Sequence, residues 1–169
     1  EHTPERELAA LLAPLDAGHD MGLMSEAGCP AVADPGAGLV RLAHARGHVV
    51  EPLIGPSSLL LALMASGANG QRFAFHGYLP QDEAGRKQAL TRLEDESRRQ
   101  GQTQIVIETP YRNRAFFESL INGLKPDTQL CVAADLTMPS QLLMTQTVQA
   151  WKKAGAPNLD KRPAVFLFK

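Results

Sequence analysis

Apolar residues in the first part of the chain follow two patterns, helical spacing and short continuous runs. Four leucines recur on one face before Gly18, which predicts a helix that begins at an N-cap, Thr3. A second helix is predicted over residues 38–46, and short apolar runs predict strands over residues 21–24 and 48–54. Because a unit of strand, loop, helix and strand needs a crossover connection, these two strands are expected to be parallel.

The rest of the chain continues as alternating helices and strands. Helices are predicted over residues 59–66, 82–99 and 112–121, and strands over residues 72–78, 103–108, 130–134 and 164–168. The flexible junction Gly67-Ala-Asn-Gly70 separates two self-consistent blocks, so a domain boundary is expected at Asn69. The expected fold is α/β, with an N-terminal domain over residues 1–69 that holds a parallel sheet and a C-terminal α+β domain over residues 70–169 that holds a mixed sheet.

Composition and charge narrow the classes of protein. The chain is 44% hydrophobic, but its apolar runs are far shorter than the roughly 18 to 20 residues that cross a bilayer, so no membrane span is expected. A formal charge of −1 provides no global field that would attract nucleic acid. Cys29 and Cys131 lie far apart, which favours neither a zinc site nor a disulfide, and a reducing cytoplasm is the expected location. The first residues carry neither an initiating methionine nor a signal pattern, so the first domain is expected to be N-terminally incomplete.

Three loops that follow predicted strands are the candidate binding segments, because ligands of α/β sheets lie outside the carboxyl ends of strands. The first, residues 25–36, is rich in small residues that let a ligand approach the backbone, and Glu26 and Asp34 offer acceptors to an amine or a hydroxyl. It contains neither of the common phosphate-binding glycine motifs, so a zwitterionic nucleoside suits it better than a nucleotide. The alternative is a tight connection whose glycines only permit turns.

The other two loops have ordinary alternatives as well. Residues 55–58 read Gly-Pro-Ser-Ser, which is also a common turn followed by a helix cap. Residues 108–113 place a carboxylate, a phenol and a guanidinium at the end of an apolar strand, where such groups are costly unless paired. An internal salt bridge between Glu108 and Arg112 is the alternative to a binding role.

Taken in order, four segments resemble the tetrapyrrole-methylase superfamily, also called class III S-adenosyl-L-methionine (SAM)-dependent methyltransferases. Within it they are most similar to the branch that methylates a ribose 2′-hydroxyl of small-subunit ribosomal RNA. That branch carries Asp where this chain has Glu26 and Thr where it has Cys29. The segments that carry the resemblance are residues 23–36, 49–58, 72–80 and 108–112.

The resemblance implies two α/β domains that hold SAM between them, no metal, and a homodimer. It also implies which residues contact the cofactor. These are Ser25, Glu26, Ala27, Gly28, Cys29, Pro30, Pro56, Ser57, Ser58, Glu108 and Thr109.

The implied reaction is methyl transfer by in-line displacement, in which the protein mainly positions donor and acceptor. Glu108 is the candidate general base for a ribose hydroxyl, and Glu26 is the other available carboxylate. The acceptor is expected to be ribosomal RNA or, alternatively, a tetrapyrrole. The departures from the branch motif leave a third possibility, a SAM-binding paralogue without turnover.

The predicted long helix bears on the choice of acceptor. Its basic residues could meet RNA phosphates, although a solvated face neutralised by acidic neighbours is the alternative. The basic residues are Arg86, Lys87, Arg92, Arg98 and Arg99, and the acidic ones are Glu83, Glu94, Asp95 and Glu96.

Overall fold

The computed structural model describes residues 4–169, and its contacts divide the chain into two compact units, Glu1–Ser57 and Ser58–Lys169. The division falls one helix earlier than the boundary expected at Asn69. Helix α4 (Ser58–Ser66), expected in the first block, packs against strands of the second unit. The reason is apolar burial, because Ala62 and Leu63 of this helix are buried in a cluster with residues of the second unit's sheet.

The first unit contains three short helices, α1 (Glu5–Leu11), α2 (Ala13–Asp16) and α3 (Ala37–Ala45). The first predicted helix is present, but it is divided into α1 and α2, with a proline in the first turn of α2. The expected N-cap, Thr3, lies outside the described residues. Leu12 is buried against Leu39 of α3, and these residues form the core of this unit together with Ala43.

The parallel sheet expected in the first unit is absent from the described residues, so this prediction was wrong. Residues 21–24 and 48–54 form no strand, and Met24, Val49 and Ile54 expose most of their side chains. The physical reason is that an extended segment becomes a strand only when a neighbour accepts its backbone hydrogen bonds. Within residues 4–57 these two segments pair neither with each other nor with any other segment.

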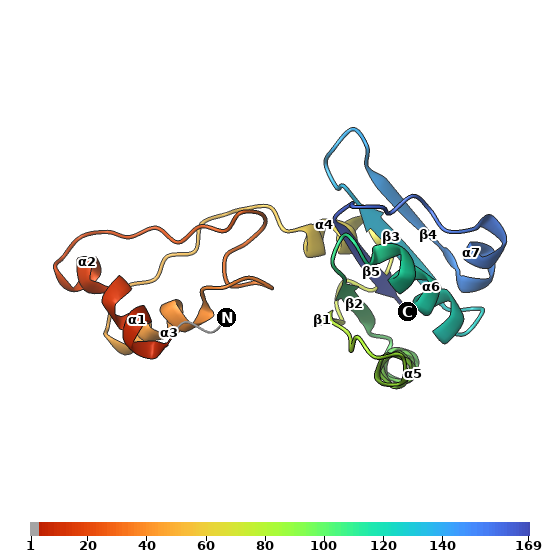
Figure 1. The fold of residues 1–169 in the computed structure, drawn as a ribbon, viewed down its shortest axis with the longest axis horizontal. Coiled ribbons are helices and arrows are strands. Elements are labelled where there is room, and N and C mark those ends of the chain that lie inside the picture. The colour runs from red at the N-terminus through yellow and green to blue at the C-terminus, as the bar shows by residue number, and fades with distance from the viewer. Residues whose placement is uncertain (1–3) are drawn as a thin grey trace. The chain divides into compact units, whose positions relative to one another are not determined.

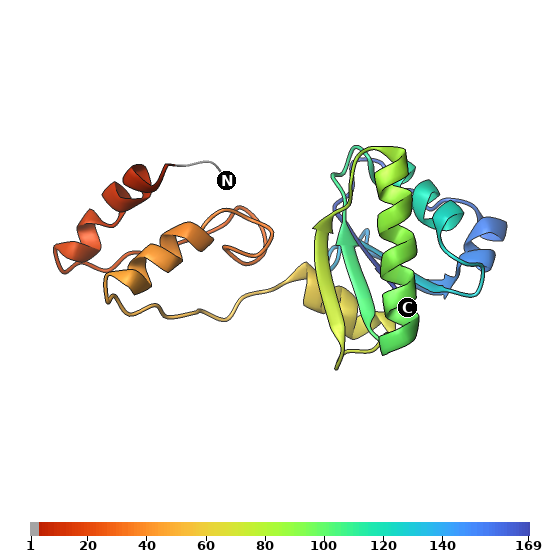
Figure 2. The ribbon, with the colours of Figure 1, turned by 90° about the horizontal axis from the view of Figure 1, so that it is seen from below.

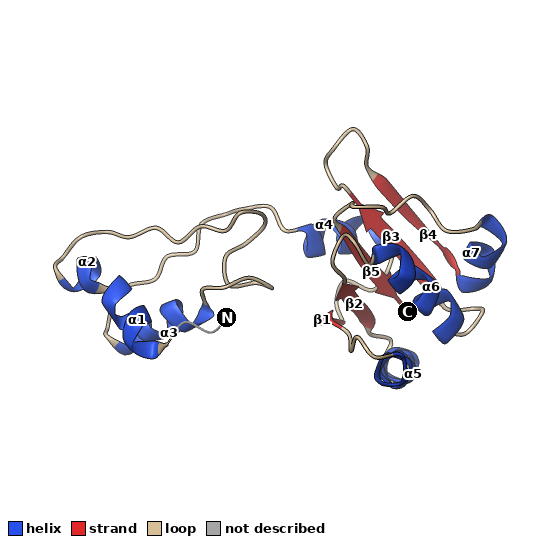
Figure 3. Cartoon of the chain, viewed as in Figure 1, coloured by secondary structure: helices blue, strands red, loops and turns tan. Residues whose placement is uncertain are grey.

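The second unit is built on a five-stranded sheet in the order β1-β2-β5-β3-β4, drawn in Figures 1 and 3. β1 and β2 are parallel and all other neighbours are antiparallel, which confirms the mixed sheet expected for this part of the chain. Four of its strands were predicted, and β4 was not. The strands are β1 (Phe73–Tyr78), β2 (Thr103–Ile107), β3 (Gln129–Ala134), β4 (Leu142–Thr147) and β5 (Ala164–Phe168).

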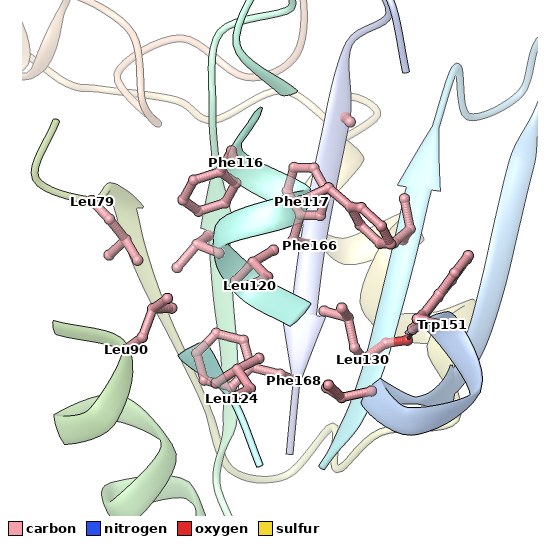
Figure 4. Packing of buried hydrophobic residues seen from close by; sticks show 14 of the residues in the cluster. Leu79, Leu90, Phe116, Phe117, Leu120, Leu124, Leu130, Trp151, Phe166 and Phe168 are labelled. Atoms are coloured by element: carbon pink, nitrogen blue, oxygen red, sulfur yellow. Dashed lines mark hydrogen bonds between the residues drawn. The ribbon is translucent and has the colours of Figure 1, made fainter. Parts of the chain in front are cut away.

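Helices cover both faces of this sheet. On one face, α5 (Glu83–Gln100), α6 (Asn113–Gly123) and α7 (Val148–Ala154) bury an aromatic-rich cluster, in which the Nε1 of Trp151 donates to the backbone oxygen of Leu130 at 2.9 Å (Figure 4). On the other face, α4 covers the alternate strand residues, among them Ile105 and Leu167. Figure 2 shows α5 running beside the strands at the outside of the unit.

No helix described between residues 4 and 169 combines the length and the apolarity that crossing a membrane requires.

Candidate cofactor-binding loops

The first candidate loop has an unusual backbone. Gly28 and Gly36 have φ values of 79° and 133°, and the non-glycine residues Ala31 and Ala33 also lie in the left-handed region, at 63° and 55°. A Cβ at Gly36 would stand 2.9 Å from the Cδ2 of Leu23, so only glycine fits there without movement of that side chain. Left-handed alanines cost roughly 1–2 kcal/mol each, and backbone strain of this kind concentrates at ligand-binding segments.

Two side-chain hydrogen bonds fix this loop and connect it to the second candidate loop. The Oγ of Ser25 donates to the backbone oxygen of Gly28 at 3.0 Å. The Sγ of Cys29 donates to the backbone oxygen of Pro56 at 3.4 Å, so the structure brings residues 25–30 and 55–56 together within the first unit. A thiol is a weak donor, and here it serves as a small contact between two loops.

The outer edge of the first loop presents free backbone donors. Glu26, Ala27 and Gly28 are exposed, while Pro30 is partly buried. Among the described residues, the N–H groups of Glu26, Ala27 and Gly28 donate to no protein acceptor. Successive free amides in a turn form a concave donor set that suits a carboxylate or another anionic group. Ser57 ends the first unit and Ser58 begins α4 of the second, so the second loop divides between the two units.

Glu108, the candidate general base, lies immediately after β2 with its side chain 5% exposed. Its Oε1 accepts from the backbone N–H of Thr109 at 2.6 Å and from the Nε and Nη2 of Arg112 at 3.2 and 2.8 Å. The Nε of Arg112 also donates to the Oγ1 of Thr109 at 3.2 Å. The internal salt bridge weighed from the sequence is therefore present, and it fixes the orientation of the carboxylate.

The same end of the sheet carries a polar cluster that sequence reasoning missed. Arg162 donates through Nε to the Oδ2 of Asp135 at 2.8 Å, and its backbone oxygen accepts from the Nδ2 of Asn113 at 2.6 Å. Asn113 is fully buried, and its Oδ1 has no partner among the described residues. The first residues of β5 pair with the last residues of β2 and β3. This cross-strand pairing places the cluster at this end of the sheet. No local motif signals contacts between residues this far apart in the sequence.

Comparison with known proteins gives the fold its class. A search against models of protein families found no match. The methyltransferase CobJ has a similar structure, with a TM-score of 0.63 and 18% identity over 99% of this chain and 71% of CobJ. Uroporphyrin-III C-methyltransferase from Thermus thermophilus, solved in complex with S-adenosyl homocysteine, gives a TM-score of 0.53 and 18% identity over 96% of this chain and 72% of that protein.

Sequence similarity is higher for a different set of proteins. Ribosomal RNA small subunit methyltransferase I from Escherichia coli O157:H7 is 35% identical over 137 residues, which make up 81% of this chain and 46% of the relative. The protein of the same name from Xylella fastidiosa is 31% identical over 166 residues, 98% of this chain and 59% of the relative.

The chain therefore has the α/β fold of CobJ and of uroporphyrin-III C-methyltransferase. Its sequence is similar to the ribosomal RNA small subunit methyltransferase I proteins, and it spans about half the length of these relatives.

Proposed function

We propose that this chain is part of a SAM-dependent methyltransferase that modifies a ribose 2′-hydroxyl of ribosomal RNA. The observation that carries the proposal is the sequence similarity. The identity is 35% with one ribosomal RNA methyltransferase, whereas it is 18% with the uroporphyrin-III C-methyltransferase of the same fold. We also propose that the protein is cytoplasmic and forms a homodimer. Sedimentation of the protein at several concentrations tests the dimer.

The first loop fits the methionine end of SAM. Its free amides at Glu26, Ala27 and Gly28 are donors for a carboxylate, and the exposed carboxylate of Glu26 is an acceptor for an ammonium group. The absence of bulky side chains lets a ligand approach this backbone closely. In the same proposal the second loop contributes Pro56, Ser57 and Ser58, and the end of β2 contributes Glu108 and Thr109.

When bound, SAM supplies a methyl group on a positively charged sulfur. The residues of the chain then have to orient the acceptor oxygen and remove its proton. We assign the removal of this proton to Glu108. Its Oε1 is held by Thr109 and Arg112, while its Oε2 accepts no hydrogen bond from residues 4–169 and is free to accept the proton. If Glu108→Gln in the whole protein retains wild-type turnover, this assignment is wrong.

A calorimetric titration tests the cofactor site directly. Leucine at position 27 places a bulky side chain on the exposed edge of the loop, so Ala27→Leu is expected to weaken SAM binding at least about tenfold, or about 1.4 kcal/mol. The matched control is Ala156→Leu, an exposed loop alanine of the second unit. Equal affinities of the two variants for SAM would contradict a cofactor site at the first loop. If the wild-type protein gives no heat with SAM or S-adenosyl homocysteine, the proposed function is contradicted.

The tetrapyrrole alternative has the support of the fold neighbours, because one of the similar structures is a uroporphyrin-III methyltransferase. A transfer assay with labelled SAM separates the two acceptors when small-subunit ribosomal RNA and uroporphyrin III are offered in parallel. Label in the RNA alone supports the proposal, and label in the porphyrin alone replaces it with the alternative. Binding of SAM without label in either acceptor identifies a paralogue without turnover.

A further inference from the structure

Helix α5 presents three basic side chains to solvent at intervals along its length. Lys87, Arg92 and Arg99 are exposed, and none of them forms an ion pair among the described residues. They line one shallow groove along the outside of the helix together with Gln88, Thr91, Arg98 and one acidic residue, Asp95. We call these three residues the basic row.

Two of the four acidic residues that were expected to neutralise this helix contact residues outside it. Glu94 is only 3% exposed and accepts from the backbone N–H of Lys125 at 2.8 Å and from the hydroxyl of Thr128. Asp95 lies 3.5 Å from the Nζ of Lys125. Of the five basic residues singled out in the sequence, Arg98 is the one held by an acid, at 2.7 Å from Asp127. The groove that holds the basic row is therefore lined by four basic side chains and one acidic side chain, Asp95, so positive charge prevails in it.

The length and chemistry of the row suit a phosphate backbone. From Lys87 to Arg99 the helix rises about 18 Å, at about 1.5 Å per residue. One strand of a nucleic acid helix carries a phosphate about every 3.4 Å along its axis, so this length faces about five phosphates. A tetrapyrrole is an anionic macrocycle that also needs apolar surface, and the groove side chains next to the cations are polar.

We propose that the basic row of α5 is a contact surface for RNA phosphates. This inference rests on the proposed function and adds to it the face of the protein on which the RNA backbone lies. The contacts position the RNA and carry no sequence information, because they reach phosphates and not bases. Their signature is a salt dependence of RNA binding that falls when the three charges are removed.

The test measures binding of a fluorescent 20-nucleotide single-stranded RNA to the chain by anisotropy at several salt concentrations. The test variant combines Lys87→Gln, Arg92→Gln and Arg99→Gln. The matched control removes three exposed basic residues from other helices of the same unit, with Arg114→Gln, Lys152→Gln and Lys153→Gln. Both triples change the net charge equally. Calorimetry with SAM on each variant checks the cofactor site separately.

The slope of log K against log salt is expected to fall by about two in the test variant, because each single-strand phosphate contact contributes about 0.7. The control triple is expected to keep the wild-type slope. Equal slopes for the test variant and wild type would overturn the inference, and so would equal losses in both triples. If the test variant loses binding of uroporphyrin III and keeps that of RNA, the row serves a tetrapyrrole instead. If the wild-type protein binds RNA through the basic row but does not bind SAM, the proposed function is contradicted while the RNA-contact surface remains supported.

Discussion

The two units of the chain bury their apolar residues to very different extents. In the second unit, every strand of the sheet has a hydrogen-bonded neighbour, and separate apolar clusters fill both faces. In the first unit, the core consists of Leu12, Leu39 and Ala43 with a few partly buried neighbours. Its most strand-like segment, residues 48–54, leaves Val49 and Ile54 almost fully exposed. The comparison teaches that apolar runs become strands only where partners complete the sheet.

The largest expected effect lies in the core of the second unit. Phe166 is fully buried in β5, and its ring meets that of Phe116 edge-on with centroids 5.2 Å apart. Phe166→Ala is expected to lower the free energy of unfolding by about 3–5 kcal/mol, because it removes a buried ring and leaves a cavity. Denaturant unfolding followed by the fluorescence of Trp151, the single tryptophan, measures this unit. The control is Tyr111→Ala, whose side chain is exposed and whose loss should stay within about 0.5 kcal/mol. Similar losses in both variants would remove the contrast between core and surface.

The success of the sequence predictions follows the same contrast. In the second unit, periodicity located α5, α6 and four of the strands, because local pattern and tertiary packing agree there. The strand over residues 142–147 was missed because it lies at the edge of the sheet with little buried surface. The helix after it carried readable signals, an N-cap at Thr147 and a glycine stop at Gly155, which the sequence reasoning did not use. In the first unit, apolar composition predicted two strands that lack partners.

The candidate site was predictable in its parts and not in its connections. Small residues and strand ends identified the loops that begin at Ser25 and follow β2, and the ion pair of Glu108 with Arg112 was anticipated as an alternative. The contact of Cys29 with Pro56 was not anticipated, because nothing local in the sequence specifies a hydrogen bond between residues this far apart. Long-range polar contacts of this kind depend on the positions of whole elements.

The first unit offers the matching core test. Leu39 packs within a small cluster whose members all belong to the first unit. Leu39→Ala is expected to cost about 2 kcal/mol, the low end for such a change, because a sparse core relaxes around the cavity. Hydrogen exchange of the amides of α1 and α3 measures the loss, and the unfolding transition of Trp151 is expected to stay unchanged. A shift of that transition as large as the one from Phe166→Ala would refute the independence of the two cores.

Substitutions in the exposed segment of the first unit, residues 48–54, are expected to have a smaller effect on stability and a measurable effect on self-association. Val49, Leu53 and Ile54 expose 94%, 87% and 107% of their reference areas, so replacing all three by serine should change the free energy of unfolding by no more than about 0.5 kcal/mol each. Self-association should fall, because unpaired extended backbone with apolar side chains is a template for pairing with another chain. Light scattering at increasing concentration measures it.

The control for this experiment uses exposed apolar residues of the second unit, with Leu60, Met64 and Met138 replaced by serine. These residues do not form one extended segment, so the control is expected to leave self-association largely as in wild type. An equal fall in both triples would mean that exposed apolar area alone drives association, and that the unpaired backbone of residues 48–54 has no special part in it.

The smallest expected effect comes from a surface ion pair of the second unit, where core packing dominates. The hydrogen bond from Arg98 holds the pKa of Asp127 below its ordinary value. A carboxylate with a lowered folded-state pKa stabilises the fold above its unfolded pKa, about 3.9, and this contribution is lost as pH falls through the folded value. Asp127→Asn should therefore lower the unfolding midpoint slightly at pH 7 and not at all once wild-type Asp127 is protonated. Asp160→Asn, at an exposed residue without an ion pair among residues 4–169, is the control and should match wild type throughout. A difference between Asp127→Asn and wild type that persists in strong acid would show that the pair acts through something other than charge.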